Sequence, residues 1–162
     1  MNYFKIFITV ILLTAISFAH AEELQASHDF DLPSKSSNIR LSDFRGKIVY
    51  LDFWASWCGP CKQSFPWMNA MHDKYKDEGL IVLAINLDSN IEDAHKFLSS
   101  NNANFSVAFD NKGATPRTYS VKGMPSSFII SREGKIIFQH VGFNENDKNK
   151  LEQKIIESLK AK

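Results

Sequence analysis

Runs of apolar residues divide the chain into short segments that are typical of β-strands. Two of these runs, 48–54 and 80–87, are almost uninterrupted, which is typical of strands buried on both faces of a sheet. Residues 132–135 have the composition of a turn, so the two strands that flank them are expected to form a hairpin. Strands are predicted at 48–54, 80–87, 105–109, 127–130 and 136–141.

Between and after these strands, hydrophobic residues recur at helical spacing. One helix is predicted to begin at Pro60, to bend at Pro66, which has no backbone N–H, and to end at Gly79. A shorter helix is predicted near 91–98. A final helix carries an apolar residue at every fourth position, namely Leu151, Ile155 and Leu159. Alternating strands and helices predict an α/β fold, with a central mixed β-sheet flanked by helices.

The first 21 residues have a different pattern, which is typical of an export signal. Lys5 precedes an apolar stretch of 13 residues from Ile6 to Phe18, and Ala19-His20-Ala21 fits a small-x-small cleavage site. Spanning a bilayer takes about 20 apolar residues, so the length favours a cleaved signal over the alternative of an uncleaved membrane anchor. We therefore expect a signal peptide at 1–21, one domain at 22–162, and an extracytoplasmic or periplasmic location.

Charge gives no reason to expect nucleic acid as a partner. Lys5 is the only charged side chain in the first 21 residues, so the remainder has 18 basic and 18 acidic residues. A balanced surface of this kind lacks the electrostatic attraction on which binding to nucleic acid or anionic lipid depends. Contact with a membrane is expected only if the N-terminal segment stays uncleaved.

The candidate chemistry lies in Cys58 and Cys61, the two cysteines of the chain. They follow a predicted buried strand and open a predicted helix, which is the context of a redox motif. The positive end of a helix stabilises a thiolate, so Cys58 is predicted to attack a partner disulfide and Cys61 to resolve the mixed disulfide. Pro60 stiffens the turn and suits the first turn of a helix.

Three other interpretations of the cysteine pair compete with this one. A structural disulfide across so short a loop would stabilise by only about 2 kcal/mol, compared with roughly 4 to 5 kcal/mol for a long loop. Half of a zinc site would need two more ligands, and the histidines show no pairwise ligand spacing. Chance is the third. The position of the pair between strand and helix favours redox chemistry, and no metal or other cofactor is expected.

Asp52 is the one polar residue inside the strand predicted at 48–54. An acid in an apolar strand should have a raised pKa, because burial disfavours its charged form. Asp52 is therefore predicted to accept a proton from Cys61, and the simpler alternative is a surface acid on an edge strand. Tyr50 and Trp54 share its face of the strand, which favours the first interpretation.

These residues resemble a known family. Residues 51–62, LDFWASWCGPCK, closely resemble the active-site strand and loop of thioredoxin, and Pro66 matches the proline of its active-site helix. Gly123-Met124-Pro125 is similar to its cis-proline loop, and Val141-Gly142 to the glycine of its last strand. Residues 41–47 and the extra helix and strand between Asp88 and Pro125 resemble the TlpA/ResA branch.

The resemblance, which covers nearly the whole mature chain, implies roles for individual residues. Cys58 and Cys61 would form a redox-active disulfide as nucleophile and resolver, Asp52 would handle the proton, and Pro125 would be the cis-proline. The substrate would bind at Trp57, Gly59, Pro60, Met124 and Pro125, with an extended partner segment pairing alongside the backbone of residues 124–126.

The function implied by the resemblance is that of an exported thiol–disulfide oxidoreductase. We expect a reductase that acts on proteins with disulfides or thiols and is itself kept reduced by a membrane electron donor of the DsbD type. The alternatives are a disulfide oxidase or isomerase, a peroxidase of the peroxiredoxin type, and a peptide-binding or chaperone module. Ala84 stands where thioredoxin has a buried lysine near the acid, so the charge coupling that tunes Asp52 is expected to differ. Asp88-Ser89 stands where cytochrome-maturation members often have a glutamate, so the resemblance leaves a role in cytochrome c maturation open.

Overall fold

The computed structural model describes residues 24–161 of the chain. The predicted signal peptide at 1–21 lies outside the described residues. Among the residues that are described, no helix is both long enough and apolar enough to cross a bilayer.

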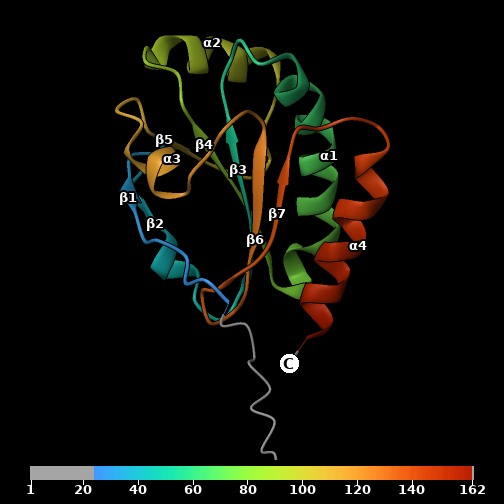
Figure 1. The fold of residues 1–162 in the computed structure, drawn as a ribbon. Coiled ribbons are helices and arrows are strands. Elements are labelled where there is room, and N and C mark those ends of the chain that lie inside the picture. Colours follow the sequence, from blue (N-terminus) through green and yellow to red (C-terminus); the bar gives the residue numbers. More distant parts are fainter. Residues whose placement is uncertain (1–23, 162) are drawn as a thin grey trace, which may run out of the picture.

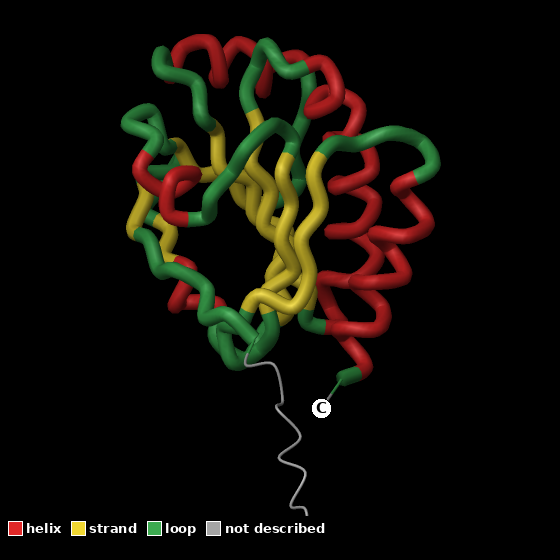
Figure 2. The backbone as a smooth tube through the Cα atoms, in the orientation of Figure 1, coloured by secondary structure: helices red, strands yellow, loops and turns green. Residues whose placement is uncertain are grey.

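A five-stranded mixed sheet forms the centre of the molecule, in the order β5-β4-β3-β6-β7 (Figures 1 and 2). β3, β4 and β5 are parallel, whereas β6 runs antiparallel to both β3 and β7. The predicted sheet and its terminal hairpin are therefore confirmed, with end shifts of one residue. The strands are β3 (Ile48–Trp54), β4 (Leu80–Asn86), β5 (Ser106–Phe109), β6 (Ser126–Ile130) and β7 (Ile136–Val141).

Two long helices, α1 (Gly59–Tyr75) and α4 (Asp147–Lys160), lie side by side against one face of the sheet (Figure 1). α1 continues through Pro66, and the short 3-10 helix η2 (Lys76–Glu78) links it to Gly79, whose φ of +99° closes the turn into β4. Leu151 and Ile155 of α4 are fully buried, as their spacing predicted.

Two further helices complete the fold. α2 (Ile91–Ser100) lies beyond the carboxyl end of β3, where the ring of Phe97 is 4.9 Å from that of Trp54 and 5.0 Å from that of Phe65. α3 (Ala114–Thr118) lies on the side of the sheet opposite α1 and α4. The sequence pattern did not predict α3, because its five residues are too few to show a helical repeat.

The sheet separates two apolar cores, and β3 contributes to both because successive side chains of a strand point to opposite faces. Tyr50 and Trp54 pack toward α1 and α4, whereas Leu51 and Phe53 pack on the other face. All seven residues of β3 are buried, which explains why its sequence is an apolar run rather than an alternation.

The second core is covered by the segment that leads into β3. This segment contains the hairpin of β1 (Asp31–Leu32) and β2 (Ile39–Arg40), followed by the 3-10 helix η1 (Leu41–Phe44). Phe30, Leu32 and Ile39 pack against the core from this side.

Candidate active site

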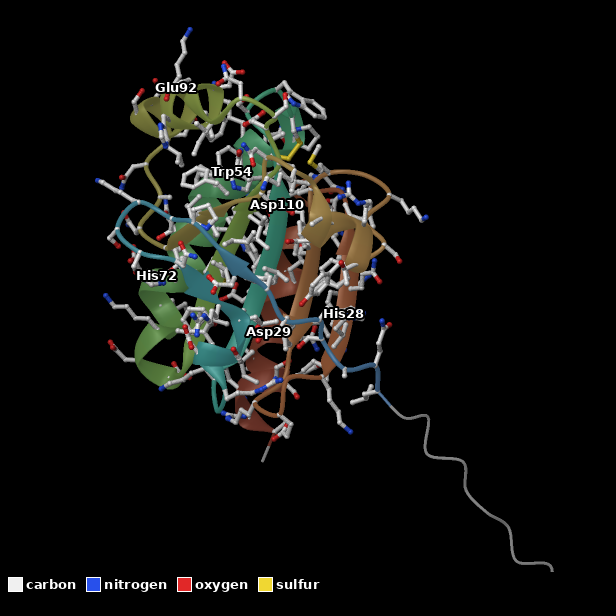
Figure 3. The ribbon with its side chains drawn as sticks, turned by 90° about the vertical axis from the view of Figure 1, so that its left-hand side faces the viewer. His28, Asp29, Trp54, His72, Glu92 and Asp110 are labelled. Carbon is white, nitrogen blue, oxygen red and sulfur yellow. A yellow bond between two sulfur atoms is a disulfide. The ribbon has the colours of Figure 1, made fainter. Side chains whose placement is uncertain are left out.

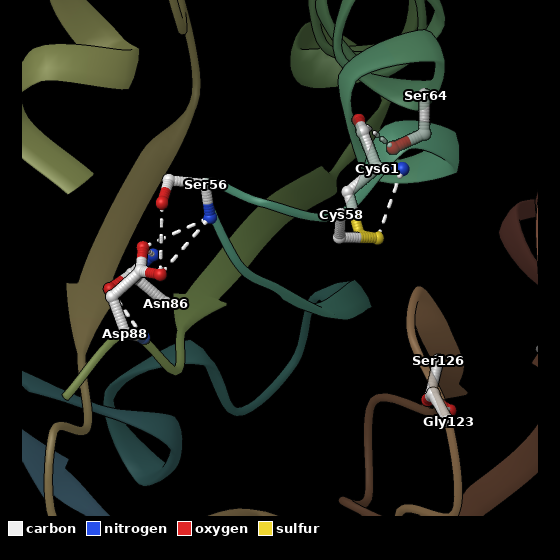
Figure 4. The surroundings of a disulfide bond; sticks show 8 residues. All are labelled: Ser56, Cys58, Cys61, Ser64, Asn86, Asp88, Gly123 and Ser126. Atoms are coloured by element: carbon white, nitrogen blue, oxygen red, sulfur yellow. Dashed lines mark hydrogen bonds between the residues drawn. A yellow bond between two sulfur atoms is a disulfide. The ribbon is translucent and has the colours of Figure 1, made fainter. Parts of the chain in front are cut away.

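Cys58 and Cys61 form a disulfide at the start of α1 (Figure 4). Their sulfurs are 1.98 Å apart and their Cα atoms 5.2 Å apart. Cys58 caps the helix and Cys61 lies in its first turn. The two differ in access, because Cys58 keeps 6% of its surface exposed and Cys61 keeps none. Of the two cysteines, Cys58 is therefore the one that keeps some contact with the surface.

The helix start supplies a positive environment for the Cys58 sulfur. The backbone N–H of Cys61 donates to Sγ of Cys58 at 3.3 Å, so a backbone donor of the first turn points at this atom. Free N–H groups and the helix dipole favour negative charge at this position. Pro60 occupies the first turn without removing a hydrogen bond that the helix needs.

Exposed residues surround the disulfide. Trp57 projects into solvent with 72% of its surface exposed, and Gly59 and Pro60 are also exposed. Because most of the surface of Trp57 is exposed, its ring is available for contact with another molecule.

A second loop lies across from the disulfide (Figure 4). The peptide bond between Met124 and Pro125 is cis, and Ser126 Oγ donates to the carbonyl of Gly123 at 2.6 Å. The carbonyl of Pro125 accepts from the N–H of Gly142 at 2.8 Å, which ties this loop to the end of β7. Val141, 53% exposed, adds an apolar surface that was not among the predicted site residues.

Asp52 lies in the middle of β3 with 1% of its surface exposed. It is therefore buried and not a surface acid on an edge strand. Burial raises the pKa of the Asp52 carboxyl to about 8, because loss of water disfavours the charged form, and the nearby Ser127 hydroxyl opposes this rise. Among the described residues, neither carboxylate oxygen has a hydrogen-bond partner of ordinary geometry.

Asp88, just beyond β4, holds the loop that precedes Cys58 (Figure 4). Its carboxylate accepts from the backbone N–H of Ser56 at 3.0 Å and from the Ser56 hydroxyl at 3.0 Å. The side-chain amide of Asn86 donates to it at 2.7 Å. β3 and β4 are parallel, so their carboxyl ends meet at one edge of the sheet and bring these three residues together.

His28 and His72 lie away from the disulfide. Figure 3 places His28 and His72 lower in the view, whereas the disulfide lies near the top. Over residues 24–161, no group of three or more His, Cys, Asp or Glu side chains is arranged to hold a metal ion.

The fold and the cysteine pair at a helix start define a protein of the thioredoxin superfamily, and comparisons with known proteins agree. The model of the AhpC/TSA family matches residues 24–139. Thiol-disulfide oxidoreductase ResA of Bacillus thuringiensis subsp. konkukian (strain 97-27) is 33% identical over 163 residues, covering 93% of this chain and 92% of that protein. ResA of Bacillus subtilis (strain 168) is 36% identical over 104 residues, covering 64% of this chain and 58% of that protein.

Solved structures show the same likeness. A putative thiol:disulfide interchange protein DsbE from Chlorobium tepidum superimposes with a TM-score of 0.83 at 58% identity, covering 84% of this chain and 96% of that one. A putative protein disulfide isomerase from Bacteroides thetaiotaomicron has a TM-score of 0.77 at 29% identity, covering 85% and 89%. The chain belongs to the AhpC/TSA family and, within it, to the ResA-like thiol–disulfide oxidoreductases.

Proposed function

We propose that this protein is an exported reductase of protein disulfides that works by exchange through Cys58 and Cys61. The observation that carries the proposal is the pair itself, with Cys58 at the helix start keeping 6% of its surface exposed and Cys61 fully buried in the first turn. The likeness of the chain to proteins named as thiol–disulfide oxidoreductases gives independent support.

The reaction starts from the reduced pair. The Cys58 thiolate attacks one sulfur of a substrate disulfide, so that a mixed disulfide forms and the other substrate sulfur leaves as a thiolate. The Cys61 thiolate then attacks Sγ of Cys58, which releases the second substrate sulfur and forms the Cys58–Cys61 disulfide. Two electrons pass from the protein to the substrate, and a membrane donor of the DsbD type returns them.

Asp52 accepts the proton that Cys61 must lose before it can attack. Burial raises the pKa of this carboxyl to about 8, which makes it a stronger base and brings it nearer to the range in which thiols ionise. An ordinary aspartate, with a pKa near 4, would be a much weaker base toward a thiol.

The substrate lies between the two loops of the site. An extended segment of the partner protein pairs with the backbone beside Met124 and Pro125, as an added strand would. Trp57, Gly59 and Pro60 form the apolar rim against which its side chains pack.

Insulin reduction by the purified domain 22–162 tests the catalytic assignment. We expect turnover by the unaltered protein and none by Cys58→Ser, because the attacking sulfur is missing. Cys61→Ser should accumulate mixed disulfides through Cys58 with proteins of the native host, since the resolving sulfur is missing. Equal turnover by the unaltered protein and Cys58→Ser would refute the assignment.

The reduction potential tests the direction of electron flow. A reductase should have a reduction potential well below that of protein disulfide isomerase, which is about −180 mV, because electrons flow from the couple of lower potential. On this scale, 30 mV corresponds to about 1.4 kcal/mol. A measured potential at or above about −180 mV would instead favour the oxidase or isomerase function.

Export is tested on the full chain in its host. Cleavage after Ala21 should give a periplasmic or extracytoplasmic protein whose N-terminal residue is Glu22. Recovery of the uncleaved chain in the membrane fraction would show an anchor instead.

A further inference from the structure

The buried carboxyl of Asp52 lies beside two buried hydroxyl groups. In the ladder between β3 and β6, Asp52 is directly opposite Ser127. Tyr50 is two residues before Asp52 and on the same face of β3, and its hydroxyl donates to Oγ of Ser127 at 2.8 Å. All three residues are almost fully buried, with at most 2% of their surface exposed.

Counting donors and acceptors shows what is left over in this group. A serine hydroxyl has one hydrogen to donate and two acceptor positions, and Tyr50 fills one acceptor position of Ser127. Among residues 24–161, no hydrogen bond of ordinary geometry takes up the hydrogen of the Ser127 hydroxyl, and the two carboxylate oxygens of Asp52 have no donor. Leaving buried polar groups unpaired costs free energy. Here the unpaired donor, the Ser127 hydroxyl, and the unpaired acceptors, the Asp52 oxygens, belong to residues that lie directly opposite each other.

No other neighbour across the sheet can serve Asp52. On β4 the residue opposite is Ala84, which has no polar side-chain atom. Directly opposite residues of an antiparallel ladder have Cβ atoms about 4.5 to 5.5 Å apart, so a small rotation of the Ser127 hydroxyl or the carboxyl can close the contact.

We propose that Tyr50 and Ser127 form a chain of two hydroxyls, in which Tyr50 donates to Ser127 and Ser127 donates to the ionised carboxylate of Asp52. The two residues are positioning residues that determine how readily Asp52 takes up and releases its proton. The inference rests on the proposed function, in which this proton comes from Cys61. No atom changes partner except the proton itself, which moves from the Cys61 thiol to the Asp52 carboxylate.

The direction of the effect follows from which form the chain stabilises. A hydroxyl that donates to a carboxylate favours the charged form, so it lowers the pKa that burial has raised. The Ser127 hydroxyl has this effect on Asp52. Tyr50 strengthens it, because a serine oxygen that already accepts a hydrogen bond is a better donor.

Few other titratable groups face this cluster. From α1, the ring of Trp67, which does not titrate, packs 5.4 Å from that of Tyr50, and the two cysteines of the disulfide belong to the same core as Tyr50. Burial is the main cause that raises the pKa of Tyr50, the charge of Asp52 adds to it, and from α4 the charge of Asp147 makes the smallest contribution. From β7, His140 is the neighbour of Ser127 on the side away from Asp52, and its Nε2 is 3.4 Å from Oδ1 of Asp147 without forming a hydrogen bond.

Titration of the Asp52 carboxyl by carbon NMR, in the oxidised domain 22–162, tests the chain without any substrate. Ser127→Ala should raise the pKa of Asp52 by about one pH unit, because the donor is lost. Tyr50→Phe should raise it by a smaller amount. Tyr119→Phe and Ser158→Ala remove buried hydroxyls that bond to backbone carbonyls elsewhere, and should leave the titration unchanged.

Two variants of equal shape, Ser127→Thr and Ser127→Val, separate the loss of the hydroxyl from an effect on folding. Threonine and valine at position 127 have the same shape and both suit a strand, but only threonine keeps the hydroxyl. Ser127→Thr should therefore titrate like the unaltered protein and Ser127→Val like Ser127→Ala. Equal pKa values of Asp52 in the threonine and valine variants would overturn the proposal.

A kinetic measurement separates this inference from the proposed function. The rate at which Cys61 resolves a preformed mixed disulfide should depend on pH, with a midpoint that moves upward in Ser127→Val by the shift seen in the titration. If Asp52→Asn resolves as fast as the unaltered protein at every pH, the role of Asp52 fails although the hydroxyl chain can still stand on its titration. If Asp52→Asn is slow but Ser127→Val does not shift the midpoint, the chain fails and the role of Asp52 stands.

Discussion

At the scale of single residues, Asp52 couples the stability of the fold to pH. In the unfolded chain its carboxyl is ionised above about pH 4, whereas in the folded protein its pKa of about 8 keeps it mostly protonated at neutral pH, with a minor ionised fraction that can accept a proton. The folded state therefore binds one more proton than the unfolded state between these limits, and stability is lost as pH rises through them. The slope is at most about 1.4 kcal/mol per pH unit from this group.

Asp52→Asn removes this dependence, because an amide does not ionise. We expect the variant to be more stable than the unaltered protein at pH 8 and the difference to shrink toward pH 5, while its thiol exchange is slower. Urea unfolding of both oxidised proteins at pH 5, 6.5 and 8 would measure the difference in their unfolding free energies. A difference in unfolding free energy that stays constant over this range would contradict the raised pKa.

At the scale of elements, the parallel strands β3 and β4 end together, and Asp88 joins the loops that follow them. Its carboxylate takes two hydrogen bonds from Ser56 and one from Asn86 in an environment where it is 3% exposed. A hydrogen bond to a charged group contributes about 1.5 to 3 kcal/mol, so Asp88 has a measurable share in fixing the position of the loop that carries Trp57.

Asp88→Ala should lower the free energy of unfolding by about 2 kcal/mol and speed hydrogen exchange at the Ser56 amide. The matched control is Asp110→Ala, which removes another buried carboxylate that accepts from a backbone N–H, that of Thr115 at 2.7 Å. The control should lose similar stability, but exchange at Ser56 should change only in Asp88→Ala. Unchanged exchange at Ser56 in both proteins would show that other contacts hold the loop.

The elements that could be predicted from the sequence are those whose signal is local. The apolar run 48–54 matches β3 residue for residue, and the turn residues 132–135 correctly indicate the β6–β7 hairpin. α3 is too short to show a repeat. Asp52 and the cysteines could be singled out from their immediate context, whereas Ser127 could not, because its bond to Tyr50 joins residues 77 positions apart.

At the scale of the whole molecule, the segment before β3 crosses the sheet from one edge to the other. Ala26 bridges to Lys135 beside β7, and Ser34 bridges to Ala108 on β5, at the opposite edge. Between these points the carbonyl of His28 accepts from the hydroxyl of Tyr119 at 2.6 Å. The segment thus packs on the face of the sheet that α1 and α4 leave free, whereas both cysteines belong to the core on the α1 side.

This arrangement predicts that the domain cannot lose residues 22–40 and keep its stability. Phe30, Leu32 and Ile39 are partly buried, and the burial of each stabilises the fold by about 1 kcal/mol. The two backbone bridges and the hydrogen bond to the His28 carbonyl add to this stabilisation. The free energy of unfolding of a domain of this size is roughly 5 to 15 kcal/mol, so the loss of these contacts removes a large share of it. A chain that starts at residue 41 should unfold in clearly less urea than the chain 22–162, with hydrogen exchange accelerated first in β5 and β7. If both chains unfold at the same urea concentration, the segment is a covering that the sheet does not need, and the second core is held by the sheet and α3 alone.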